Sequence, residues 1–280
     1  MIQRNFPLSR HGLRWGLAAL LWACPLVMAL AEAPKPVPPP ALVPDSVGRV
    51  AEIVDGDTVI LADGREVRLV GIQAPKLPLG RDMEPWPLAD RAHAGLAGLV
   101  EGRRVALAYG GRRKDRYDRH LAHLLRPGGH PATPTLWVQG ALVARGLARV
   151  YSFADNRTAV PELLRLERAA RAAGRGIWAH PFYRVRTRRE AHEAVGSFQV
   201  VLARVRETAE VRGRVYLNFG ADWRSDFTVS IPPRARERFA EAGIDPLSYE
   251  SRWVRVRGWI ESYNGPSIEA THPEQIEVIP

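Results

Sequence analysis

The sequence of 280 residues contains a single cysteine, Cys24. This cysteine lies inside an apolar N-terminal run, so a chain processed after that run would carry no thiol and no disulfide. The stability of the protein therefore has to come from hydrophobic cores. Hydrophobic residues make up 46% of the sequence, which is enough for two modest domains and excludes a disordered chain.

Acidic residues are too few to balance the basic ones, and the formal net charge is +10. From Ser46 to Arg184 there are 22 Lys and Arg against 14 Asp and Glu, a net charge of +8. From Val185 to Pro280 the two kinds number 14 each, so the basic excess belongs to the first part. Such an excess predicts an anionic polymer as partner, DNA or RNA, although a solvated arginine-rich surface is the alternative.

Repeats are absent, and the only biased tract is the proline-rich stretch Pro34 to Pro44, which predicts an extended spacer. Before it, three arginines precede the apolar run Trp15 to Leu30, and small residues follow that run. This layout predicts a signal peptide over residues 1–31 and a linker over 32–46.

We therefore expect an exported protein, periplasmic or secreted, with no stable membrane association after cleavage. The apolar run is somewhat short for a membrane-spanning helix, and an uncleaved anchor is the alternative. A lipoprotein site at Cys24 is disfavoured by the neighbouring Trp22 and Pro25.

Three charged positions stand out in the part that follows. The acidic turn Asp55-Gly56-Asp57-Thr58 lies where one strand ends and the next begins, which predicts Asp57 at a rim. Arg68 shares the face of its strand with apolar neighbours, an unusual place unless an anion or carboxylate receives its guanidinium. Arg119 begins another strand. Two arginines and one acid make a candidate phosphodiester site.

Five segments in order resemble the thermonuclease, or staphylococcal-nuclease-like, family: VDGDTV, VRLVGIQAPK, RYDRHLAHL, GLARVY and GRGIW. The resemblance spans about residues 47–184 and implies an OB-type five-stranded barrel with packed helices. It also implies a nuclease that hydrolyses phosphodiester bonds of DNA or RNA. In the family, a calcium ion and two arginines hold the scissile phosphate while a carboxylate activates water.

The resemblance assigns a role to each matching position. Asp57 corresponds to a metal-binding aspartate, and Arg68 and Arg119 correspond to the two phosphate-binding arginines. Arg116 and Tyr117 fall where the family places a cation and a ring beside the nucleotide. A hard cation prefers carboxylate oxygens, and a planar guanidinium matches two phosphate oxygens.

Two positions depart from the pattern. Gln73 replaces the second metal-binding aspartate, and Lys76 replaces the general-base glutamate. A divalent cation such as calcium should therefore bind poorly. Three alternatives follow: Asp82 or Glu84 in the long loop after Lys76 supplies a ligand or base, Lys76 itself acts as base or phosphate clamp, or the domain binds without catalysis.

The remaining segment, residues 196–280, predicts five short strands with one helix from Pro233 to Ala242. This pattern indicates a second, smaller OB-like barrel, so the fold class is mainly β with helices. The charged stretch Arg184 to Glu193 is expected to be either the connection between the two domains or the last helix of the first. Six aromatic residues of this segment are candidates either for an exposed surface that assists nucleic-acid binding or for the core of the barrel: Tyr216, Phe219, Trp223, Phe227, Trp259 and Tyr263.

Overall fold

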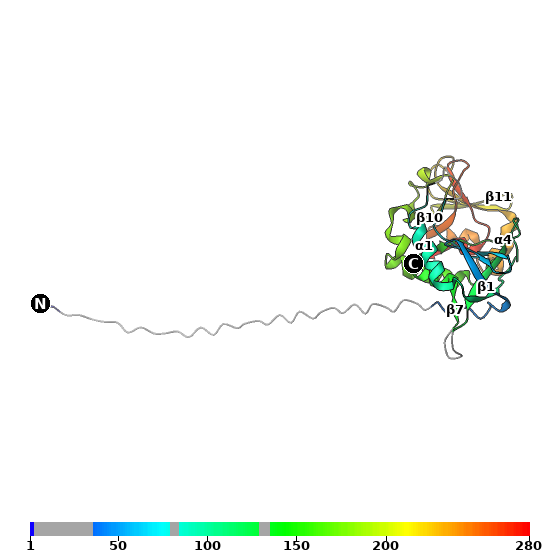
Figure 1. The fold of residues 1–280 in the computed structure, drawn as a ribbon. Coiled ribbons are helices and arrows are strands. Elements are labelled where there is room, and N and C mark those ends of the chain that lie inside the picture. Colours follow the sequence, from blue (N-terminus) through cyan, green and yellow to red (C-terminus); the bar gives the residue numbers. More distant parts are fainter. Residues whose placement is uncertain (3–35, 79–83, 129–134) are drawn as a thin grey trace. The chain divides into compact units, whose positions relative to one another are not determined.

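The computed structural model describes residues 1–2, 36–78, 84–128 and 135–280 (Figure 1). Almost all of the predicted signal peptide lies outside these residues. Ala33–Pro280 forms one compact unit that contains two hydrophobic cores. No helix of the described part of the chain is long and apolar enough to cross a membrane.

The first core lies inside a sheet that closes on itself. The strands follow the order β3-β2-β1-β5-β6, and β3 also pairs with β6 in parallel, which completes the ring. This arrangement confirms the mainly β class, and the short β7 extends the sheet beyond β6. The strands are β1 (Pro44–Asp55), β2 (Thr58–Leu61), β3 (Glu66–Leu69), β5 (Arg104–Ala108), β6 (His120–Arg126) and β7 (Leu136–Trp137).

The hairpin between β2 and β3 shows why these residues form a half-buried sheet. Val59, Leu61, Val67 and Leu69 alternate along the two strands, and all four are buried. Gly64 in the intervening turn has φ +85°, a left-handed conformation that glycine adopts without steric cost.

Three helices pack around the first core, namely α1 (Ala89–Val100), α2 (Val138–Ala144) and α3 (Val160–Ala172). The sequence predicts a helix from Leu88 to Val100 by the spacing of its apolar residues and another from Pro161 to Ala173, which begins with proline and ends at Gly174, so the observed bounds of α1 and α3 differ by one residue at most at each end. It predicted one helix from Thr135 to Arg145, whereas Leu136 and Trp137 pair with the end of β6 instead. The fully buried Trp137 accounts for this difference, because pairing with β6 places its ring in the core.

The second core lies between two sheets of order β17-β14-β10-β9 and β11-β12-β13-β16-β15. One helix, α4 (Pro233–Glu241), precedes β14 as predicted. The strands are β9 (Arg186–Thr187), β10 (Phe198–Arg204), β11 (Glu207–Val211), β12 (Arg214–Asn218), β13 (Thr228–Ile231), β14 (Trp253–Trp259), β15 (Glu261–Ser262), β16 (Pro266–Glu269) and β17 (Ile276–Ile279).

The structure decides between two pairs of alternatives for this second part. Phe219 and Phe227 are buried with ring centroids 5.0 Å apart, so they form core and present no surface for a ligand. The charged stretch after Arg184 is not a regular α-helix. It contains the short strand β9 and a turn in which Glu190 accepts hydrogen bonds from Arg184 and Thr187.

Candidate functional site

The acidic turn between β1 and β2 places two carboxylates close together. Oδ1 of Asp55 accepts the backbone N–H of Asp57 at 2.8 Å. Gly56 separates them, and a Cβ at this position would lie 2.7 Å from the Cβ atoms of Ala74 and Ala92. Tight packing of this kind explains why Asp57 is fully buried and does not stand at an open rim as predicted.

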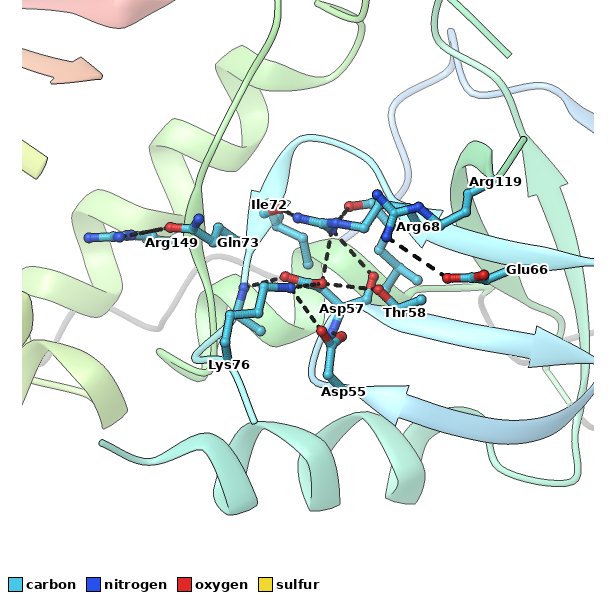
Figure 2. Close-up of polar contacts among 12 residues, drawn as sticks. Asp55, Asp57, Thr58, Glu66, Arg68, Ile72, Gln73, Lys76, Arg119 and Arg149 are labelled. Atoms are coloured by element: carbon cyan, nitrogen blue, oxygen red, sulfur yellow. Dashed lines mark hydrogen bonds and ion pairs between the residues drawn. The ribbon is translucent and has the colours of Figure 1, made fainter. Parts of the chain in front are cut away.

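Arg68 of β3 reaches over this turn from its position opposite Thr58 (Figure 2). Its Nη1 lies 3.2 Å from Oδ1 of Asp57, so a carboxylate receives this guanidinium, as one of the two predicted alternatives requires. Three backbone carbonyls also accept from it: Asp57 at 3.3 Å, Leu69 at 2.6 Å and Ile72 at 2.8 Å. Because a guanidinium has five N–H donors, about two remain for a ligand.

Lys76 joins the two aspartates (Figure 2). Its Nζ lies 2.6 Å from Oδ1 of Asp57 and 2.9 Å from Oδ2 of Asp55. The other oxygen of Asp57, Oδ2, accepts the backbone N–H of Ala74 at 2.6 Å. The pocket therefore holds two carboxylates and two cations, Lys76 and Arg68, and is close to neutral.

Burial acts on the two carboxylates with different results. It raises the pKa of Asp57 above the ordinary value, although attraction to Arg68 and Lys76 opposes the rise. Burial also acts to raise the pKa of Asp55, but the charge and hydrogen bond of Lys76 outweigh it, so the pKa of Asp55 is lowered. Lys76 thus favours the ionised form of Asp55, and Arg68 together with Lys76 favours the ionised form of Asp57 against its burial.

The residue that replaces the second metal-binding aspartate has a partner of its own. Oε1 of Gln73 accepts from Nε and Nη2 of Arg149, at 3.0 and 2.7 Å. The pairing of β4 (Ile72–Gln73) with β8 (Arg149–Val150) brings these side chains together. Sequence reasoning missed Arg149. Its place two residues from Leu147 and from Tyr151 was a usable signal, since Arg68 was identified by apolar residues on the same face of its strand.

A calcium ion does not fit this arrangement. Calcium takes six to eight oxygen ligands. Here the inward oxygens of Asp55 and Asp57 are already bound to an ammonium, and the amide oxygen of Gln73 is bound to Arg149. In the described part of the chain, no group of three or more His, Cys, Asp and Glu side chains could hold a metal ion.

Arg119 lies on the same face of the sheet as Arg68. Arg68 is opposite Leu121 in the parallel β3–β6 pairing, and Arg119 comes two residues before Leu121, so the two arginine side chains point to the same side. Its guanidinium bonds to Asp115 through Nε and Nη2, each at 2.8 Å, and its Nη1 is 3.9 Å from Glu66. It makes no direct contact with Asp57 in the structure, so the two predicted phosphate-binding arginines flank the pocket separately.

Arg116 and Tyr117 form an exposed pair in the turn before β6. The Nη2 of Arg116 donates to the hydroxyl oxygen of Tyr117 at 2.6 Å. The guanidinium carbons of Arg116 and Arg119 lie 4.7 and 5.5 Å from the Tyr117 ring centroid. The structure thus brings together the predicted nucleotide-binding pair and Arg119.

The long loop after Lys76 returns to its starting point. The backbone N–H of Trp86 donates to the carbonyl of Lys76 at 2.9 Å, which closes the loop over nine intervening residues. Glu84 is exposed two residues before this closure. The other predicted alternative ligand or base, Asp82, lies outside the described residues.

Comparisons with known proteins cover this same part of the chain. Residues 66–180 match the family model described as staphylococcal nuclease homologue. The protein ParB of Escherichia coli is 36% identical over 140 residues, 48% of this chain and 73% of that protein. An uncharacterized endonuclease of Escherichia coli O157:H7 is 33% identical over 143 residues, 50% of this chain and 82% of that protein.

The matched region contains Arg68, Gln73, Lys76, Arg119 and Arg149, and it begins after the acidic turn that carries Asp55 and Asp57. The family match and the relative named as an endonuclease support a nuclease-like domain in this part of the chain. The chain belongs to the staphylococcal nuclease family.

Proposed function

We propose that this protein is an exported, nucleic-acid-binding member of the nuclease family in which hydrolysis is strongly impaired. The observation that carries the proposal is the position of Lys76, whose ammonium lies within 2.9 Å of both Asp55 and Asp57. It fills the space between the carboxylates with a cation that belongs to the chain.

Impaired hydrolysis follows from what this lysine replaces. Attack on a phosphodiester needs a positioned base to take a proton from water, and such a base contributes roughly 10² to 10⁴-fold. Lys76 is held by two carboxylates, and both Asp57 oxygens are already occupied by donors. A group in these bonds is poorly placed to receive a proton from water.

Binding survives the same change, because the cations that counter a phosphate charge remain. Arg68 retains about two free N–H donors and Arg119 about three by the same donor count. The net charge of +8 on the nuclease-like half adds a longer-range attraction for a polyanion.

Binding is tested with labelled DNA and RNA oligonucleotides and the purified mature protein in chelator. Affinity should fall steeply with salt, and Arg68→Ala and Arg119→Ala should each weaken it by about 1.5 to 3 kcal/mol, the range for hydrogen bonds to charged groups. Arg145→Ala, which changes an arginine outside the pocket, is the control. Binding that ignores salt and survives the double change would place the site elsewhere.

A second candidate is hydrolysis with Glu84 as the base. The observation that favours it is the hydrogen bond from Trp86 to Lys76, which keeps the end of this loop beside the pocket. Glu84→Gln should then abolish cleavage that the wild type shows in a zymogram. If the wild type does not cleave, or the variant cleaves equally well, this candidate is wrong.

Export rests on the three arginines ahead of the apolar run that ends at Leu30. The mature protein should begin near Glu32 or Pro34 and should be recovered from the periplasm or the medium. N-terminal sequencing of the natural product measures this directly, and recovery of the full-length chain from membranes would contradict it.

A further inference from the structure

Four aromatic residues meet where the two halves of the compact unit touch, and we call them the aromatic junction: Tyr151, Phe153, Phe198 and Trp259. The Tyr151 ring centroid lies 4.7 Å from Phe198 and 4.8 Å from Phe153, both edge-on. The indole Nε1–H of Trp259 donates to the hydroxyl oxygen of Tyr151 at 2.9 Å. The C-terminal half thus supplies Phe198 and Trp259, which face each other in the β10–β14 pairing.

The aromatic junction is continuous with the phosphate pocket. The guanidinium carbon of Arg149 lies 4.7 Å from the centroid of the Phe198 ring, while its nitrogens bond Gln73. Gln73 follows Ile72, whose carbonyl accepts from Arg68. One chain of contacts therefore leads from Arg68 to the rings at the junction.

A buried ion cluster fixes the two strands that carry these rings. Arg257, two residues before Trp259 on β14, is 1% exposed and bonds Glu167 at 2.8 Å and Glu277 at 2.6 Å. Glu167 in turn accepts the backbone N–H of Val150, the residue before Tyr151, at 2.8 Å. The relative placement of Tyr151 and Trp259 is thus set before any ligand binds, which lowers the entropy lost on binding.

Two rings of the aromatic junction stay in contact with water despite this fixed frame. Trp259 is 46% exposed and Phe153 is 48% exposed. The polar atom of the Trp259 indole already has its partner in Tyr151, so what remains for a ligand is the ring itself. A fixed, exposed ring beside a basic phosphate site suits an unpaired nucleobase, because proteins bind single strands by stacking bases over a positive groove.

We propose that Trp259 stacks a base of a single-stranded nucleic acid that also places a backbone phosphate at Arg68. This inference rests on the proposed function and extends it in two ways. It assigns the C-terminal half a direct part in binding, and it makes a single strand the preferred ligand. The bases of a duplex are already stacked and cannot reach the ring without unpairing.

The test uses the full mature protein in chelator and measures fluorescence anisotropy of a labelled single-stranded oligonucleotide and of the same oligonucleotide in a duplex. Trp259→Ala should weaken single-strand binding roughly ten-fold or more and change duplex binding little, given the usual contribution of a base stacked on an aromatic ring. Trp259→Phe keeps a ring but loses the hydrogen bond to Tyr151, and it should retain most of the affinity.

The matched control is Trp253→Ala, which removes an exposed tryptophan, 52% accessible, from the other end of the same strand. It should leave binding unchanged. The inference is overturned if Trp259→Ala behaves like this control, if it weakens duplex and single strand equally, or if the wild type prefers duplex. Unfolding curves of each variant identify any loss that arises from misfolding. If Trp259→Ala misfolds, Trp259→Leu, which keeps an apolar side chain without an aromatic ring, takes its place and should weaken single-strand binding to the same extent.

The same measurements separate this inference from the proposed function. If Arg68→Ala abolishes binding while Trp259→Ala has no effect, the phosphate site stands and stacking is wrong. If Trp259→Ala weakens single-strand binding and Arg68→Ala does not, stacking stands and the phosphate site is wrong.

Discussion

Replacing Lys76 with methionine should destabilise the protein in a way that calcium reverses. The substitution keeps most of the side-chain length and removes the charge. Asp57 is fully buried and Asp55 nearly so, and both lose the ammonium that lies 2.6 and 2.9 Å away. The two carboxylates would then face each other without the cation that joins them.

The size of the effect follows from this geometry. Removing one partner of a buried ion pair costs about 3 to 5 kcal/mol. Asp57 keeps Arg68 at 3.2 Å and the backbone N–H of Ala74, so we expect a loss near the lower end, about 3 kcal/mol. Calcium that binds the freed carboxylates should restore part of this stability, because a ligand that binds only the folded state stabilises it.

Urea unfolding of the wild type and of Lys76→Met, in chelator and in calcium, measures both effects. Lys114→Met is the matched control, since Lys114 pairs at 2.8 Å with an exposed Asp118 and such surface pairs contribute about 0 to 1 kcal/mol. The reasoning would be refuted if Lys76→Met unfolded like the control, or if calcium stabilised the wild type as much as the variant.

Three further predictions address the pocket, the junction of the two cores and the acid response. Gln73→Asp together with Lys76→Glu should create calcium binding, measured by calorimetry, and raise hydrolysis about 10² to 10⁴-fold; no gain in either would contradict this. Arg257→Ala should cost about 3 kcal/mol in urea unfolding, because two buried glutamates lose their buried partner and keep Arg171 and Arg168, and a loss below about 1 kcal/mol would argue against it. Burial lowers the pKa of His123 to about 4, and burial with nearby arginines lowers that of His272 to about 3. Between pH 6.5 and 4 the unfolded state therefore takes up these protons while the folded state does not. Stability should therefore fall by up to about 1.4 kcal/mol per histidine per pH unit between pH 6.5 and 4, and a flat profile there would be inconsistent with buried neutral rings.

Much of the fold follows from local pattern. The alternation along β2 and β3, the turn at Gly64 and the helical spacing of α1 are all visible in the sequence and are found in the structure. Among the strands that were missed, β11 lacks such a signal. β11 consists of Glu207, Thr208, Ala209, Glu210 and Val211, none of them buried, and forms the edge of its sheet, so no hydrophobic face marks it.

The site was predictable in its members but not in their partners. Asp57, Arg68 and Lys76 could be identified from the sequence. The contact of Lys76 with both aspartates, in contrast, depends on the path that the chain takes after β4. Arg149 is 76 residues away from Gln73, and only the pairing of β4 with β8 brings the two together. The burial of Phe219 and Phe227 likewise depends on which face of each segment turns toward the second core.

The central claim is that Lys76 has replaced both the cation and the base of a nuclease pocket while binding remains. The most direct measurement follows cleavage and binding of end-labelled single-stranded DNA and RNA by the mature protein, side by side in chelator and in calcium. We predict equal binding in both conditions and no cleavage in either. Calcium-dependent cleavage that disappears in Asp57→Asn would contradict the account.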